Sequence, residues 1–134
     1  MVDAIQSLLP SPISVHHLGL YREKSTLQPV EYYNNLPHGD DSNSEAKIAI
    51  LVDPVIATGG TAIAAIQTLR EWGVQKVIVI NVITALEGLK RAAEEWPEST
   101  TFWVGAVDEE LTDKGMIKPG LGDIGDRLYG TVGK

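Results

Sequence analysis

The sequence predicts an α/β protein built on a mainly parallel sheet. Between residues 47 and 107, apolar runs of strand length alternate with segments whose apolar residues recur at helical spacing. The order is strand, helix, strand, helix, strand, and the connecting loops have a few residues each. Such alternation is typical of parallel strands covered by helices. In these sheets, ligands bind beyond the carboxyl ends of the strands.

Length and composition set the first limits. The 134 residues suit one domain, residues 1–134, and 43% of them are hydrophobic. A net charge of -7 argues against nucleic acid as the main partner, because such binding needs a surplus of Lys and Arg. The absence of Cys excludes disulfides, thiolate nucleophiles and thiolate metal sites. No apolar run approaches the length of a membrane span and no signal segment is recognisable, so we expect a cytoplasmic protein without membrane contact.

The first third of the chain predicts a helix and two extended segments. Residues 2–9 have the apolar spacing of a short helix, which Pro10 ends. Residues 13–21 and 30–36 are predicted as extended segments. The polar stretch 37–44 has no periodicity and is predicted as a hairpin tip or an insertion.

The central stretch of the sequence joins a strand to a helix through a loop of small residues. Residues 48–52 form an apolar run with β-branched residues, as in a buried strand, and Asp53 follows where the strand stops. Residues 57–61 are Ala-Thr-Gly-Gly-Thr, and a helix is predicted from residue 62 to about Gly73. One face of this helix carries Ala62, Ala65, Ile66 and Leu69.

This strand, loop and helix favour a phosphate site. The first N–H groups of a helix lack intrahelical acceptors and carry the positive end of the helix dipole. Gly59 and Gly60 allow close approach of the backbone, and Thr58 and Thr61 add hydroxyl donors. Gly-Gly-Thr alone is also an ordinary βα turn, but Asp53 at the strand end makes the anion site the better interpretation. No Lys follows the glycines, so this is not a Walker loop.

Two more strands and one helix complete the alternation. Residues 77–82 and 101–107 are predicted strands, and the apolar spacing between 86 and 96 predicts a helix that Pro97 ends. Residues 81–85 and Asp108 would then lie at the same sheet edge as Asp53. The three tryptophans, Trp72, Trp96 and Trp103, are predicted to be packing residues.

The C-terminal segment 118–127 is rich in glycine and acid. Gly120, Gly122 and Gly125 match G-x-G-x-x-G, but no clear strand precedes them and too few residues follow for a dinucleotide-binding unit. The glycines favour a backbone that approaches a flat ligand, whose amide edge exposed N–H and C=O groups could recognise. A glycine-rich C-terminal loop without a ligand fits these residues equally well.

Three separate segments together resemble the uracil phosphoribosyltransferase family. They are Gly-Leu-Tyr-Arg at 19–22 with Thr-Leu-Gln-Pro-Val at 26–30, Val-Asp-Pro-Val-Ile-Ala-Thr-Gly-Gly-Thr at 52–61, and Pro-Gly-Leu-Gly-Asp-Ile-Gly-Asp-Arg at 119–127 with Tyr-Gly-Thr at 129–131. The resemblance implies a three-layer sheet of phosphoribosyltransferase type with a β-hairpin arm. The family carries an N-terminal part, with a central strand and a second diphosphate-binding loop, that has no match here. We therefore expect an incomplete sheet and weak or no turnover.

The resemblance also implies site residues. Asp53, Arg22 and Asp123 would be catalytic. The residues implied for 5-phosphoribosyl 1-diphosphate (PRPP) are Arg22, Asp53, Pro54, Val55, Ile56, Ala57, Thr58, Gly59, Gly60, Thr61 and Asp123. The residues implied for uracil are Ile117, Gly122, Asp123 and Ile124.

The implied reaction transfers the phosphoribosyl group from PRPP to uracil and yields UMP and diphosphate. It depends on positioning and electrostatics more than on a nucleophile, with Mg²⁺ carried by PRPP and no certain protein ligand. The family also implies GTP binding and a homodimer or higher homo-oligomer. Two alternatives remain: a non-catalytic PRPP- or uracil-binding partner of a full-length relative, and an RNA-binding regulator on a related fold, which the acidic charge disfavours.

Overall fold

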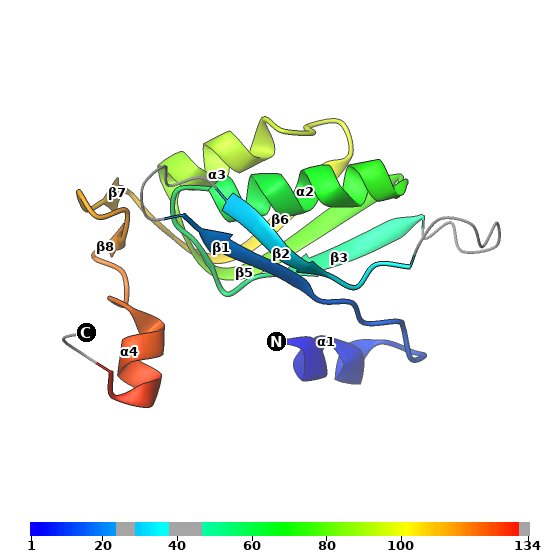
Figure 1. The fold of residues 1–134 in the computed structure, drawn as a ribbon, viewed down its shortest axis with the longest axis horizontal. Coiled ribbons are helices and arrows are strands. Elements are labelled where there is room, and N and C mark those ends of the chain that lie inside the picture. The colour runs from blue at the N-terminus through cyan, green and yellow to red at the C-terminus, as the bar shows by residue number, and fades with distance from the viewer. Residues whose placement is uncertain (24–28, 38–46, 132–134) are drawn as a thin grey trace.

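The computed structural model describes residues 1–23, 29–37 and 47–131. Figure 1 shows a sheet with two helices on one face and shorter elements on the other. In chain order the elements are α1 (Val2–Leu8), β1 (Leu18–Arg22), β2 (Pro29–Asn34), β3 (Ile48–Val52), β4 (Val55–Ile56), α2 (Gly60–Trp72), β5 (Lys76–Ala85), α3 (Leu86–Ala93), β6 (Thr100–Asp108), β7 (Glu110–Leu111), β8 (Ile117–Lys118) and α4 (Ile124–Tyr129).

The main sheet is parallel, as the sequence predicts. Strand β5 is its centre, because β3 and β4 pair with successive stretches of one edge of β5, and β6 pairs with the other edge between Val77 and Ala85. The predicted α/β class with a parallel sheet is therefore confirmed. At ten residues, β5 is longer than the predicted 77–82, since its second half pairs with the short, unpredicted strand β4.

Helices α2 and α3 lie side by side over one face of this sheet (Figure 1). The predicted helical face is confirmed, because Ala62, Ala65, Ile66 and Leu69 are the buried residues of α2. Ala62, Ile66 and Leu69 form one core cluster with Val77 and Val79 of β5, which have no exposed surface. Helix α3 ends at Ala93, three residues before the predicted end at 96.

The opposite face of the sheet is less covered. Trp103 lies on this face of β6, and 65% of its surface is exposed, so its prediction as a packing residue was wrong. Within the described residues, only α1 and α4 lie on this side, and both are short (Figure 1). Trp72 and Trp96 do pack: the Trp72 Nε1–H donates to the Pro37 carbonyl at 2.8 Å, and the Trp96 ring lies 5.5 Å from the Arg70 guanidinium.

The predicted hairpin arm is confirmed as the antiparallel pair β1–β2. Its first strand begins at Leu18 instead of residue 13. Among the described residues, residues 13–17 form no strand ladder and make one backbone hydrogen bond, from the Asn35 N–H to the His17 carbonyl. An extended segment without a ladder is not held as a strand. The predicted polar loop 37–44 lies outside the described residues, except for Pro37.

Two C-terminal features were not predicted: the small hairpin β7–β8 and helix α4. Both are too short to produce a hydrophobic period in the sequence. Within the described chain, every helix is too short or too polar to span a membrane.

Truncation of Ile66 tests the core. Ile66 of α2 is fully buried in the core beneath the helix. Ile66→Ala should therefore lower the free energy of unfolding, measured by urea denaturation, by about 2–5 kcal/mol. The control is Leu8→Ala, at a side chain that is 84% exposed, with an expected change within about 0.5 kcal/mol. Equal effects of the two variants would contradict this description of the core.

Candidate functional site

The predicted phosphate loop lies at the carboxyl end of β3, as expected. Here the glycine loop denotes residues 57–61. Gly59 is the N-cap of α2 and has a φ of 85°, a left-handed conformation that favours glycine. Helix α2 begins at Gly60, two residues earlier than predicted. Among the described residues, none accepts a hydrogen bond from the N–H of Gly59 or Gly60. The loop therefore presents backbone donors at the positive end of a helix dipole.

One predicted loop residue points inward. Ile56 is 2% exposed and belongs to the hydrophobic core. Its side chain therefore packs beneath the sheet edge, and only its backbone is available to a ligand. The carbonyl of Pro54 accepts hydrogen bonds from Val82 and Ile83 at 3.2 Å each, which joins the start of the loop to β5.

Asp53 is a partly buried carboxyl group between β3 and β4. Burial raises the pKa of Asp53 above its usual value, and a hydrogen bond of 3.3 Å from the Val55 N–H opposes that rise. A carboxylate kept at the edge of the sheet despite this cost is a candidate functional group.

Three residues behind the glycine loop were missed by the sequence analysis. The Thr84 hydroxyl donates to the Ile56 carbonyl at 3.0 Å, and the Arg91 guanidinium donates to the Thr58 carbonyl at 2.9 Å. Gly88 approaches the Ala57 carbonyl so closely that a Cβ on Gly88 would lie 2.0 Å from that oxygen. These contacts join segments about 30 residues apart, so no local pattern could have revealed them.

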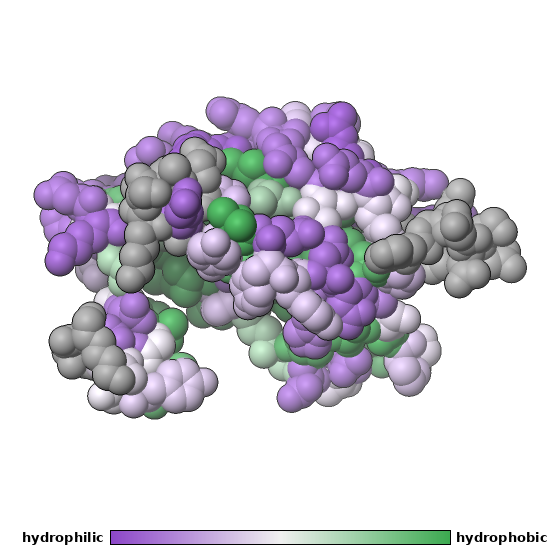
Figure 2. Space-filling view, in the orientation of Figure 1, coloured by the Kyte–Doolittle hydropathy of each residue, from purple (hydrophilic) through white to green (hydrophobic). Residues whose placement is uncertain are grey.

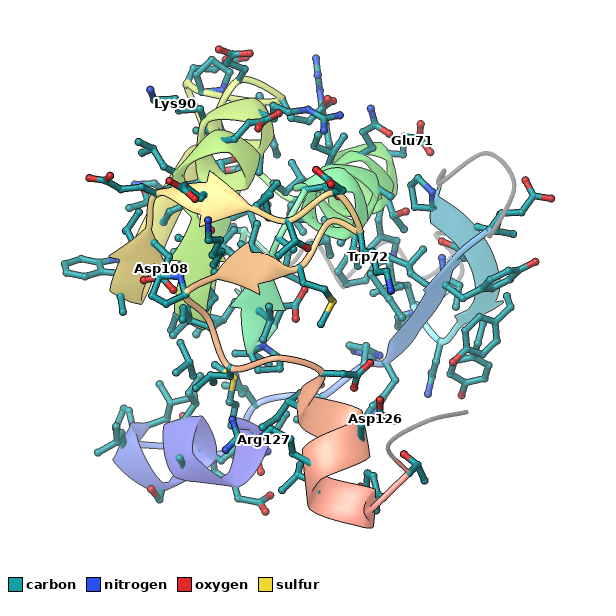
Figure 3. The ribbon with its side chains drawn as sticks, turned by 90° about the vertical axis from the view of Figure 1, so that its left-hand side faces the viewer. Glu71, Trp72, Lys90, Asp108, Asp126 and Arg127 are labelled. Atoms are coloured by element: carbon teal, nitrogen blue, oxygen red, sulfur yellow. The ribbon has the colours of Figure 1, made fainter. Side chains whose placement is uncertain are left out.

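The C-terminal glycine segment is tied to the end of β6. Asp108, predicted only to lie at this edge, accepts a hydrogen bond from the Gly120 N–H at 2.9 Å (Oδ2). Figure 3 shows Asp108 where β6 ends. Gly120 has a φ of 55°, and a Cβ there would lie 2.1 Å from the Ile117 carbonyl oxygen. Glycine is therefore required at 120 by both conformation and space.

Asp123 and Ile124 form the start of α4 instead of continuing a loop. The Asp123 carboxylate is the N-cap and accepts a hydrogen bond from the Asp126 N–H at 3.0 Å. The guanidinium of Arg127 donates to the Leu121 carbonyl at 2.9 Å, which holds the preceding turn against the helix. Figure 3 shows Asp126 and Arg127 on this helix, on the opposite side of the sheet from α2 and α3.

The two predicted binding segments meet in one small apolar cleft. Figure 2 shows hydrophobic residues in the hollow between the C-terminal part and the body of the protein. The cleft is lined by Val55 and Ala57 of the predicted PRPP segment, by Ile117, Gly122 and Ile124 of the predicted uracil segment, and by Ile83, Met116 and Leu121, which the sequence analysis did not single out. The structure thus brings together segments more than 50 residues apart, and their roles in binding stay predictions.

Other predicted residues are less defined. The backbone of Arg22 ends β1 opposite Pro29, but its side chain is outside the described part of the structure. Across the described residues, no group of three or more His, Asp or Glu side chains could hold a metal ion.

Comparison with known proteins decides the family. The profile described as uracil phosphoribosyltransferase matches residues 1–131. The chain belongs to the uracil phosphoribosyltransferase family. Uracil phosphoribosyltransferases of Roseiflexus castenholzii and Lachnoclostridium phytofermentans are 46% and 47% identical to it over 98% of its length.

A solved structure agrees with the fold of this family member. The structure of AQ2163 protein from Aquifex aeolicus matches with a TM-score of 0.70 and 46% identity, over 85% of this chain and 52% of that one. The chain spans about 60% of the length of the curated uracil phosphoribosyltransferases it matches.

The raised pKa of Asp53 predicts a pH-dependent stability difference. An acid with a higher pKa in the folded state binds more protons when folded, so unfolding becomes easier as pH rises from the usual value of 3.8 through the raised value. Asp53→Asn removes this titration and keeps an acceptor for the Val55 N–H. We therefore expect Asp53→Asn to unfold at a higher urea concentration than the wild type at neutral pH.

The gain from Asp53→Asn should shrink as the pH falls towards the usual aspartate pKa. Asp113→Asn, in an exposed turn, is the control and should show no such trend. A gain that is independent of pH would contradict the assignment of the effect to ionisation of Asp53.

Proposed function

We propose that this chain binds PRPP and uracil and acts as a uracil phosphoribosyltransferase, a pentosyltransferase that forms UMP and diphosphate. The observation that carries the proposal is the apolar cleft in which Val55 and Ala57 face Ile117, Gly122 and Ile124. Two segments that the family resemblance links to different substrates line one cleft, as a transfer between those substrates requires.

The glycine loop would hold the 5′-phosphate of PRPP. The N–H groups of Gly59 and Gly60, at the start of α2, supply donors where the helix dipole favours an anion. Hydroxyl groups of Thr58 and Thr61 add further donors. Asp53, at the end of β3, would accept hydrogen bonds from the ribose hydroxyls, which would offset the cost of its burial.

The C-terminal segment would hold uracil. Ile117 and Ile124 offer apolar contact to the faces of a flat ring, and the backbone at Gly122 offers groups for its amide edge. The hydrogen bond from the Gly120 N–H to Asp108 keeps this segment at the end of β6. Asp123, the N-cap of α4, would lie near PRPP at this end of the cleft.

The reaction would need electrostatic positioning by these residues. The bond from the anomeric carbon to diphosphate breaks, the bond to a ring nitrogen of uracil forms, and that nitrogen loses its proton. Arg22 would contact the diphosphate. The ion would be held mainly by diphosphate oxygens and water, with Asp123 nearby. When bound, Mg²⁺ would neutralise the diphosphate charge.

A second candidate function is a non-catalytic PRPP- or uracil-binding chain that associates with a full-length relative. The exposed apolar side chains of Val82 and Trp103, on one face of the sheet, favour such an association. The family resemblance also supports GTP binding, a homodimer or higher oligomer, and a cytoplasmic location.

Calorimetric titration with PRPP and Mg²⁺ tests the shared part of both candidates. The wild type should bind PRPP, and Asp53→Ala should weaken binding by about tenfold or more, because it removes a hydrogen-bonding carboxylate. Asp113→Ala is the control at an exposed turn. Absence of binding to the wild type at millimolar PRPP would contradict both functions.

An assay of UMP formation from uracil, PRPP and Mg²⁺ separates the two candidates. Turnover that Asp53→Ala abolishes supports the enzyme. PRPP-dependent association with a full-length relative, without turnover of its own, supports the binding partner. PRPP-dependent association together with turnover that Asp53→Ala abolishes would contradict the non-catalytic candidate.

A further inference from the structure

Three residues of the β5–α3 connection form a support behind the glycine loop. Thr84 lies near the end of β5, Gly88 in the first half of α3 and Arg91 in its last turn. The spacing of three residues places Gly88 and Arg91 on one side of α3. None of the three belongs to the segments that resemble the family motifs.

Their contacts fall on three consecutive carbonyl groups. The Thr84 hydroxyl donates to the carbonyl of Ile56 at 3.0 Å, the nearer of two acceptors, since the Ala85 carbonyl lies at 3.2 Å. Arg91 donates to the carbonyl of Thr58 at 2.9 Å. Between them, the Ala57 carbonyl occupies the space that a side chain at position 88 would fill. Thr84 has no exposed surface, so its hydrogen bond is shielded from water.

Because the peptide bond is planar, contacts that hold a carbonyl group also fix the direction of the N–H group that follows it. In a planar trans peptide, the C=O of one residue and the N–H of the next point in opposite directions. Carbonyls of residues 56, 57 and 58 directed at β5 and α3 therefore direct the N–H groups of residues 57, 58 and 59 to the other side. A glycine-rich loop has many conformations to lose, so prior orientation reduces the cost of binding.

We propose that Thr84, Gly88 and Arg91 are positioning residues that hold the carbonyls of residues 56–58 and so aim the loop N–H groups at a phosphate. The orientation of the loop N–H groups is inferred from the contacts described above. The identity of the anion as a phosphate rests on the proposed function. These residues act through the loop backbone and need not touch the substrate.

The backbone part of the proposal is tested without a ligand. Arg91→Ala removes the hydrogen bond to Thr58, and Lys90→Ala removes a neighbouring positive charge from the outer side of α3 (Figure 3). We expect ¹⁵N relaxation to give lower order parameters for residues 57–59 in Arg91→Ala, from about 0.85 towards 0.6, and unchanged ones in Lys90→Ala. Unchanged order parameters in both variants would overturn the proposal.

Two variants of Thr84 provide a second, independent test of the proposal. Thr84→Val removes the hydroxyl and keeps the shape, whereas Thr84→Ser keeps the hydroxyl. The order parameters of the loop should fall in the first variant and recover in the second. Equal effects of Val and Ser would show that packing, and not the hydrogen bond to Ile56, holds the loop.

Binding then tests the consequence. Titration with ribose 5-phosphate and with PRPP and Mg²⁺ should show about tenfold weaker binding by Arg91→Ala, unchanged binding by Lys90→Ala and partial recovery by Arg91→Lys. Any measurable turnover should show a raised KM for PRPP with kcat retained. A loosened loop with wild-type affinity would overturn the positioning role. Failure of the wild type to bind either compound would instead refute the proposed function, while the relaxation data would still decide whether the support exists.

Discussion

Strand β5 pairs in parallel with β3 and β4 along one edge and with β6 along the other. Because parallel strands end at the same side of a sheet, this pairing brings together residues far apart in the chain. The pairing places Asp53, the glycine loop, Thr84 and Asp108 at the same edge of the sheet. The buried residues of β5 against α2 and α3 hold the arrangement, since slipping by one residue would turn Val77 and Val79 out of the core.

The candidate site is made largely of backbone held in place by side chains from neighbouring elements. Gly59 and Gly120 adopt conformations suited to glycine, and each lies too close to another carbonyl to carry a side chain. Hydrogen bonds from Thr84 and Arg91 hold backbone carbonyls close to Gly59, and Asp108 accepts a hydrogen bond from the N–H of Gly120. The glycine-rich segments are therefore ordered, because contacts from other parts of the fold remove the backbone conformational freedom that glycine allows.

The two faces of the sheet differ in how well they are covered. Helices α2 and α3 bury one face, whereas Trp103 and Val82 leave the other partly open to solvent. Parallel sheets usually have both faces covered. An apolar surface of this kind favours contact with another polypeptide, which agrees with the association considered for this family member.

Residue order alone was enough to predict the α/β class, the parallel sheet and the buried face of α2, because apolar periodicity and short loops are local properties of the chain. The hairpin arm was predicted from the family resemblance. The segments later joined in one cleft were also recognisable, from glycines, acids and their similarity to a family. Tertiary structure decided that Ile56 points into the core, that Trp103 is exposed and that Asp123 begins a helix. It alone revealed Thr84, Gly88, Arg91 and Ile83 beside the loop or cleft, because those contacts depend on how β5 and α3 pack and leave no mark in the local sequence.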